Sequence, residues 1–124
     1  MAKPEFTCSV ATRFLPDQSD STRSTYSFAY TIVIHNTGDV PAQLIARHWI
    51  ITDLAGKTQE VRGLGVVGNQ PLLKPGEHFE YSSWVQIATP RGQMQGTFFC
   101  VTDAAQFFDT PVPAFELSMN TALH

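Results

Sequence analysis

A glycine-rich segment in the middle of the chain has the spacing of a phosphate-binding loop. Residues 63–68 (GLGVVG) satisfy the pattern G-x-G-x-x-G, in which glycines let the backbone approach a pyrophosphate closely. In dinucleotide-binding folds this turn opens a helix, but Pro71 and Pro75 prevent a helix across 69–76. A P-loop is excluded as well, because Asn69 and Gln70 replace the lysine and the hydroxyl residue that the motif requires.

Two interpretations of this segment stay open. The first is a structural loop whose glycines adopt positive φ or allow close backbone packing. The second is a nest of backbone N–H groups that binds an anion, and the cationic residue directly before the loop favours it. The candidate ligand-binding residues are Arg62, Gly63, Gly65, Val66, Val67, Gly68, Asn69 and Gln70.

The remaining reactive side chains have no recognised catalytic or metal-binding spacing. The sequence contains no G-x-S-x-G motif, and Ser82 and Ser83 lie in the centre of a strand-like pattern. The histidines form neither an H-x-H nor an H-x-x-x-H pair, although residues on neighbouring strands could still converge. We therefore predict a protein that is not an enzyme, with no catalytic residues, no metal ligands and no cofactor. The four histidines are His35, His48, His78 and His124.

Two cysteines, Cys8 and Cys100, lie within strand-like patterns. We expect both to be small buried hydrophobic residues without a redox or metal-binding role. The sequence shows no apolar leader segment after its first residues, so we expect the protein in the cytosol, where thiols stay reduced. The longest apolar stretch, 98–101, is far shorter than the roughly 20 residues that cross a membrane, so no membrane association is expected.

Composition and charge narrow the class of protein. The chain has 124 residues, of which 43% are hydrophobic and 15% are charged, and this balance excludes an intrinsically disordered chain. A formal net charge of −3 lacks the basic excess that nucleic-acid binding needs, so no nucleic-acid partner is expected. The length suits a single domain over 1–124, with its core at about 6–117.

Alternation of apolar and polar residues dominates the chain and predicts strands. Short strands separated by turn residues predict an all-β, seven-stranded sandwich of two sheets, whose spacing resembles an immunoglobulin or fibronectin type III domain. No helix longer than a single turn is expected. The seven predicted strands lie at about 6–14, 26–34, 44–54, 57–62, 79–87, 96–103 and 107–117.

The same alternation predicts where individual side chains point. In the third strand we expect Ile45, Trp49 and Ile51 to share one face, with His48 on the opposite face. The adjacent phenylalanines at 98–99 and at 107–108 must each place one ring on either face of their strand. At least two rings should therefore point outward, and exposed aromatic rings near a sheet edge mark an interaction site.

Edge strands are predicted from residues that tolerate or enforce an incomplete hydrogen-bond ladder. The polar run 57–62 suits an edge. Pro111 and Pro113 lack backbone N–H donors, so the last strand should be an edge or contain a break. Open edges also allow a homodimer to form by pairing of edge strands.

Several segments together resemble the bacterial ApaG family. They are 62–71 (RGLGVVGNQP), 73–77 (LKPGE), 79–83 (FEYSS), 89–96 (TPRGQMQG) and 111–117 (PVPAFEL), and the similarity covers about 6–117. The resemblance implies a fibronectin type III-like sandwich that acts in protein–protein interaction. It also implies links to diadenosine tetraphosphate metabolism and, under the name CorD, to cobalt resistance and magnesium efflux. Members of the family commonly have acidic residues where Leu64 and Asn69 stand here.

Two functions therefore compete. The leading hypothesis is a non-catalytic binding module that presents a sheet edge, expected at 57–62, and loops to a protein partner. The alternative is a small-ligand protein that binds a polyphosphate nucleotide or pyrophosphate at the glycine-rich loop 63–68, with or without a divalent ion. In the alternative, Gly65 is the position where the backbone approaches the phosphate.

Overall fold

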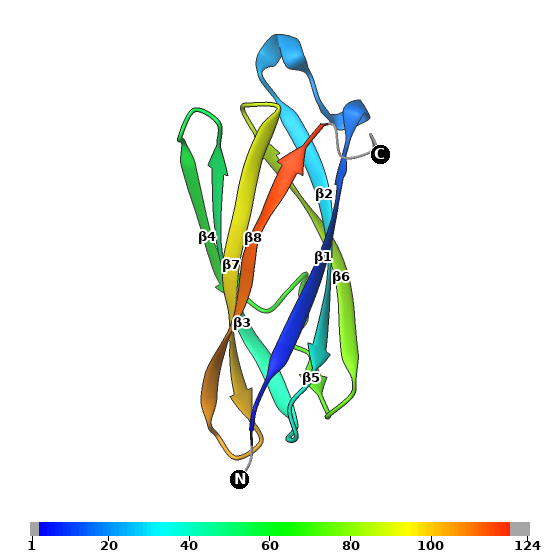
Figure 1. Cartoon of the computed structure of the whole chain (residues 1–124), viewed down its shortest axis with the longest axis vertical. Helices are drawn as coiled ribbons and strands as arrows, with labels where there is room; N and C mark the ends of the chain where they lie inside the picture. The colour runs from blue at the N-terminus through cyan, green and yellow to red at the C-terminus, as the bar shows by residue number, and fades with distance from the viewer. Residues whose placement is uncertain (1–2, 120–124) are drawn as a thin grey trace.

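The computed structural model describes residues 3–119, which form two antiparallel sheets packed face to face (Figure 1). One sheet has the strand order β1-β2-β6, and the other has the order β4-β3-β7-β8 with β5 paired to β3. The strands are β1 (Phe6–Phe14), β2 (Tyr26–Asn36), β3 (Ala42–Asp53), β4 (Thr58–Leu64), β5 (Leu72–Leu73), β6 (His78–Ile87), β7 (Arg91–Thr102) and β8 (Phe107–Ser118). The predicted all-β sandwich is confirmed. It has eight strands where seven were predicted, because Leu72–Leu73 pairs briefly with the start of β3.

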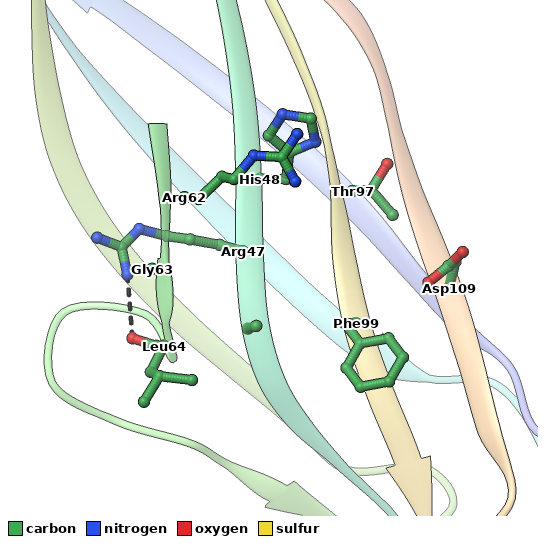
Figure 2. A pocket seen from close by; sticks show the side chains of 9 residues that line it. Arg47, His48, Arg62, Gly63, Leu64, Thr97, Phe99 and Asp109 are labelled. Carbon is green, nitrogen blue, oxygen red and sulfur yellow. Dashed lines mark hydrogen bonds between the residues drawn. The ribbon is translucent and has the colours of Figure 1, made fainter. Parts of the chain in front are cut away.

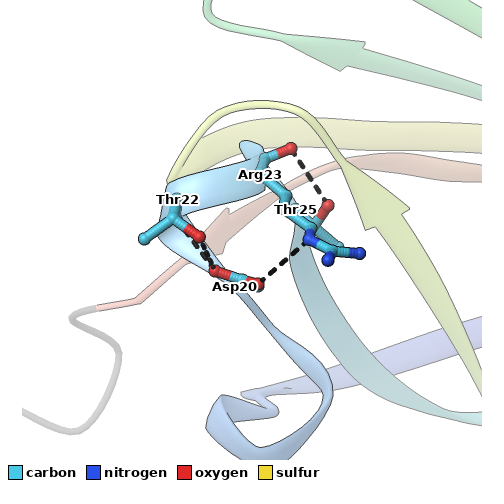
Figure 3. Close-up of polar contacts among 4 residues, drawn as sticks. All are labelled: Asp20, Thr22, Arg23 and Thr25. Atoms are coloured by element: carbon cyan, nitrogen blue, oxygen red, sulfur yellow. Dashed lines mark hydrogen bonds and ion pairs between the residues drawn. The ribbon is translucent and has the colours of Figure 1, made fainter.

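The connection between β1 and β2 contains two short 3₁₀ turns, η1 (Pro16–Gln18) and η2 (Ser21–Arg23). Asp20 caps the second turn by accepting hydrogen bonds from the backbone N–H and the hydroxyl of Thr22 (Figure 3). Arg23 Nε lies 3.7 Å from Asp20 Oδ2, and the Thr25 hydroxyl donates to the Arg23 carbonyl. Single turns of this kind agree with the prediction that the chain forms no long helix.

A β-bulge corrects the predicted face of the third strand. The register between β3 and β7 shifts between Leu44 and Ala46. Leu44 is therefore fully buried together with Trp49 and Ile51, whereas Ile45, predicted to share their face, is only half-buried at the bulge. The bulge inserts one residue that the simple period of two does not anticipate. His48 lies on the outer face, opposite in direction to Trp49, as predicted.

The centre of the core is an aromatic cluster around Trp49. Its indole packs against Tyr30 of the facing sheet at a centroid distance of 5.9 Å, against Phe98 at 5.6 Å and against Phe115 at 6.2 Å. Gly96 lies directly opposite Trp49 in the ladder. A Cβ at Gly96 would lie 2.4 Å from the indole Cε3 atom, so only glycine leaves room for the ring.

Both cysteines are free thiols: Cys100 is buried in this core as predicted, whereas Cys8 is only half-buried and packs against it. Burial raises the pKa of Cys100 to about 11 and the pKa of Cys8 to about 12, and the proximity of the two thiols adds to the increase at Cys8. At neutral pH both groups therefore stay protonated, in agreement with the predicted apolar character of the two side chains.

The two edges of the larger sheet follow the sequence prediction. β8 pairs with β7 alone, and its register shifts opposite Met94 and Gly96, next to Pro113. The proline-containing strand is thus an edge and contains an irregularity. β4 forms the other edge, and all of its residues except Gly63 are exposed.

Because Trp49 packs on Gly96, an alanine at this position should lower the stability of the fold more than an alanine at a glycine with open space around it. Gly96→Ala should destabilise the fold by about 3 kcal/mol, because the methyl group meets the indole and the His48 carbonyl oxygen. Gly76→Ala is the control: its position is open but has a φ of +86°, so a cost of about 1 kcal/mol is expected. Urea unfolding of both variants measures the difference. Equal losses of stability would contradict the close approach.

Candidate functional site

The outer face of the larger sheet carries a shallow cleft of about 620 Å³ (Figure 2). Strand register explains which residues meet there. Leu64 of β4, Ala46 of β3, Phe99 of β7 and Asp109 of β8 stand in one row across the sheet. The next row runs from Arg62 through His48 to Thr97, also in register. The cleft is therefore assembled from two pairs of consecutive strands, β3–β4 and β7–β8, which are distant from each other in sequence.

The small side chain of Ala46 leaves an apolar slot between two larger residues. Leu64 stands on one side of it with 74% of its surface exposed, and Phe99 stands on the other with 40% exposed. Phe107 is 63% exposed and stacks on Phe99, with the ring centroids 5.2 Å apart and an interplanar angle of 17°. The slot thus has two exposed apolar walls, one of them extended by a second ring.

The predicted division of the phenylalanine pairs is confirmed. Phe98 is fully buried while Phe99 faces solvent, and Phe107 faces solvent while Phe108 packs edge-on against Phe6 in the core. One ring of each pair therefore lies on the outer face, next to the β8 edge.

One end of the cleft carries a small cluster of charged and polar groups. The Arg62 guanidinium lies beside the His48 ring (Figure 2), and it forms two contacts with Glu60 Oε1, from Nε at 3.1 Å and from Nη2 at 3.0 Å. His48 Nε2 lies 3.5 Å from the same oxygen. The Arg62 hydrogen bond and charge lower the pKa of the Glu60 carboxyl group. The positive charge of Arg62 is therefore balanced within its own strand.

Arg47 fixes the junction between β4 and the glycine-rich loop. Its Nη1 donates hydrogen bonds to the carbonyl oxygens of Leu64 and Gly65, both at 3.0 Å. The guanidinium also lies flat against Gly63, where a Cβ would come within 2.9 Å of its atoms. Gly63 is thus explained by the close approach of an arginine from the neighbouring strand.

The glycine-rich loop itself is closed by the chain's own hydrogen bonds. The Gly65 N–H donates to the Ile45 carbonyl at 2.8 Å. Val66 and Asn69 exchange two backbone hydrogen bonds, at 2.7 and 2.9 Å, around a two-residue turn. Val67 and Gly68 form that turn with φ values of +47° and +80°. Three amides that a phosphate nest would use are therefore already donated to carbonyl oxygens.

The predicted ligand-binding residues separate into two groups. Arg62 and Gly63 line the cleft, whereas Val66 is fully buried beneath the loop. Asn69 Nδ2 donates to the Val67 carbonyl, and Gln70 Nε2 donates to the Ile45 carbonyl, so both side chains stabilise the loop. Anion binding at the Val67 and Gly68 amides stays a prediction.

Sequence reasoning missed contacts that depend on strand register. His35 and His78 stand opposite each other on β2 and β6, with ring centroids 5.4 Å apart. Arg47 was not recognised as a partner of the glycine-rich loop. Within residues 3–119, His, Cys, Asp and Glu do not gather in groups of three or more that could hold a metal ion. No helix in this range is long and apolar enough to cross a membrane.

The fold and the cleft define an all-β sandwich with a partly apolar recess on the outer face of one sheet. The chain belongs to the ApaG domain family, which matches residues 16–102. It is 55% identical over its full length to the protein ApaG of Ralstonia nicotianae, with both chains completely covered. It is 54% identical to the protein ApaG of Nitrosospira multiformis, covering 98% of this chain and 96% of the relative.

A crystal structure from Bordetella pertussis has the same fold. It superposes with a TM-score of 0.93 at 52% sequence identity, covering 96% of this chain and 97% of that one. A second solved structure, 39% identical, superposes with a TM-score of 0.88.

The two loop glycines with positive φ should respond differently to alanine. At Gly65, with a φ of +63°, an added Cβ would lie 2.3 Å from the Asn69 carbonyl oxygen, whereas the position of Gly68 is open. Gly65→Ala should therefore cost about 3 kcal/mol of stability and Gly68→Ala about 1 kcal/mol. Urea unfolding and hydrogen exchange of the Val66 and Asn69 amides measure the two effects. Similar behaviour of both variants would argue against this account of the loop.

Proposed function

We propose that the chain is a non-catalytic binding module that docks a protein partner in the cytosol through the outer face of its larger sheet. The stacked and exposed pair Phe99–Phe107 is the observation that carries this proposal. Exposed aromatic rings beside a recess are typical anchors of protein interfaces, because they bury large apolar area at little conformational cost. The ApaG resemblance, which implies protein–protein interaction, agrees with this choice.

The layout of the cleft fits an apolar side chain of a partner protein. The slot over Ala46 offers apolar walls from Leu64 and Phe99, and charged groups border it on both sides. Arg62 lies on the β4 side and Asp109 on the β8 side. An apolar centre with a polar rim is the usual anatomy of a docking surface.

The surroundings of His48 support a role without catalysis. His48 is the residue of the cleft that would serve as a general base. Its Nε2 makes no hydrogen bond to a hydroxyl or thiol group of the described residues. A nucleophile activated by a base needs such a contact.

Polar substitution of the two outer rings tests the docking surface. The double variant Phe99→Ser and Phe107→Ser should fold normally and lose at least nine-tenths of the captured partner in a quantitative pull-down from cell lysate. Trp84→Ser is the matched control, since Trp84 is 63% exposed on the smaller sheet. Capture that survives the double substitution, or that falls equally with Trp84→Ser, would reject this surface.

Polyphosphate binding is the second candidate, favoured by the adjacent Arg62 and His48 beside an exposed aromatic ring. In this role the phosphates would bind to Arg62 of the cleft and to the Val67 and Gly68 amides of the loop that follows β4. This binding would also connect the chain to the diadenosine tetraphosphate and divalent-ion links that the ApaG resemblance implies.

An amide NMR titration with diadenosine tetraphosphate, ATP and pyrophosphate, each with and without magnesium, tests this candidate. Saturable shifts at Val67, Gly68 and His48 are expected, and Arg62→Gln should abolish them. The Gly65→Val substitution is unsuitable here, because its side chain would distort the loop whether or not phosphate binds. Absence of shifts at millimolar ligand would exclude the candidate.

A further inference from the structure

The free edge of β4 has hydrogen-bonding groups whose direction can be deduced. At one end of the strand, the Asp53 N–H donates to the Lys57 carbonyl at 3.0 Å; at the other end, the Gly65 N–H donates to the Ile45 carbonyl at 2.8 Å. Both pairs obey the register in which Trp49 stands opposite Val61. In an antiparallel ladder, residues bonded to the neighbouring strand alternate with residues whose groups point away.

It follows that odd-numbered residues of β4 bond to β3 and even-numbered residues face the open edge. Backbone N–H and C=O groups pointing away from the sheet belong to Thr58, Glu60, Arg62 and Leu64. The side chains of these four residues lie on the outer face, and Arg62 and Leu64 are in register with His48 and Ala46 of the cleft. The edge is thus a template for one further antiparallel strand.

We propose that this strand is β4 of a second copy of the chain, paired about a two-fold axis at Val61. In this register Glu60 faces Arg62 of the second copy, and Thr58 faces Leu64 of the second copy. The two pairs between Glu60 and Arg62 can each exchange two hydrogen bonds. In the pairs between Thr58 and Leu64, the Leu64 carbonyl oxygen already accepts a hydrogen bond from Arg47 Nη1 of its own chain. Val61 faces Val61 of the second copy. No hydrogen bond between the copies is needed at this position, because the backbone N–H and C=O groups of Val61 bond to β3.

Charge complementarity selects this register. Centring the axis on Val61 places each Glu60 between two arginines, its own Arg62 and that of the second copy. Centring it on Glu60 or on Arg62 would instead bring identical charges directly opposite each other. Opposite charges across antiparallel strands stabilise the pairing and like charges destabilise it, so only one of the three registers is favourable. A two-fold interface requires this kind of self-complementary surface.

The exposed apolar residues around β4 agree with a covered edge. Val61 and Leu64 belong to the strand, Leu54 lies in the turn before it and Val67 lies in the turn after it, and all four are exposed in the single chain. Two copies joined through β4 would bring the Leu54 turn of one chain toward the Val67 turn of the other. The pairing would thus remove apolar surface from water at both ends of the new ladder.

The other edge strands lack this self-complementarity. β8 contains Pro111 and Pro113. β1 carries Arg13 as its only charged residue, and β6 carries Glu80 without a lysine or arginine. None of these strands can place opposite charges across a two-fold axis. The inference therefore concerns β4 alone, and it does not depend on the proposed docking function.

Charge reversal tests the pairing by sedimentation equilibrium of the full chain. The native chain should dimerise, and Glu60→Arg and Arg62→Glu should each weaken the dimer at least tenfold, because like charges then face each other. An equimolar mixture of these two variants should dimerise again, because every basic position of one chain then faces an acidic position of the other. In each variant, residues 60 and 62 of one chain carry the same charge. Dimer formation in the mixture therefore reports contact between the two different chains.

Disulfide formation tests the register. Val61→Cys should form a dimer under mild oxidation, since paired residues at a position without ladder hydrogen bonds have Cα atoms roughly 4.5 Å apart, within the span of a disulfide. Gln59→Cys is the control, because it faces Gly63 of the second copy and should stay monomeric. A native chain that is monomeric at millimolar concentration would overturn the proposal. So would a charge mixture that fails to associate, or equal crosslinking at both positions.

Discussion

The packing of the Trp49 indole on Gly96 is the constraint on which the larger sheet depends. The ring occupies the space that a side chain at Gly96 would need, and it contacts Tyr30 from the facing sheet and Phe115 from β8. Its N–H has no hydrogen-bond partner among the described residues, so apolar packing alone holds it in place. One residue of β3 therefore packs against β7 and β8 of its own sheet and against β2 of the other, and a side chain at Gly96 would push these strands apart.

The contact between Trp49 and Gly96 also determines which side chains stand next to each other on the outer face of the sheet. Because Trp49 is locked opposite Gly96, the next residues of β3 and β7 are locked as well, and His48 stands opposite Thr97. The same register places Ala46, rather than a large residue, opposite Phe99, directly next to the bulge. The recess between Leu64 and Phe99 is a consequence of this register, and a slip by one residue would exchange the inner and outer side chains.

Much of this arrangement could be predicted from local patterns. Alternation predicted the strands and the outward rings of both phenylalanine pairs, and the prolines predicted the edge position of the last strand. These features depend on a few consecutive residues and on the period of two. The likeness to fibronectin type III domains stays a prediction beyond the sandwich itself.

Features that depend on contacts between distant strands could not be predicted in this way. The bulge that buries Leu44 in place of Ile45 arises from pairing with β7, more than forty residues away. The contact of His35 with His78 and the packing of the Arg47 guanidinium against Gly63 also depend on the register between strands. A single sequence records none of these registers, because many alignments of two alternating strands bury equivalent apolar faces.

The glycine-rich segment shows why a motif must be judged by the structure around it. Its three glycines satisfy one sequence pattern, but each is required for a different structural reason. Gly63 admits the Arg47 guanidinium, Gly65 avoids the Asn69 carbonyl oxygen, and Gly68 supplies a positive φ in an open turn. A loop built for phosphate would direct these amides toward one point outside the chain. Here the loop ends β4 and turns the chain toward β5, so the spacing of its glycines follows first from the path of the backbone at the sheet edge.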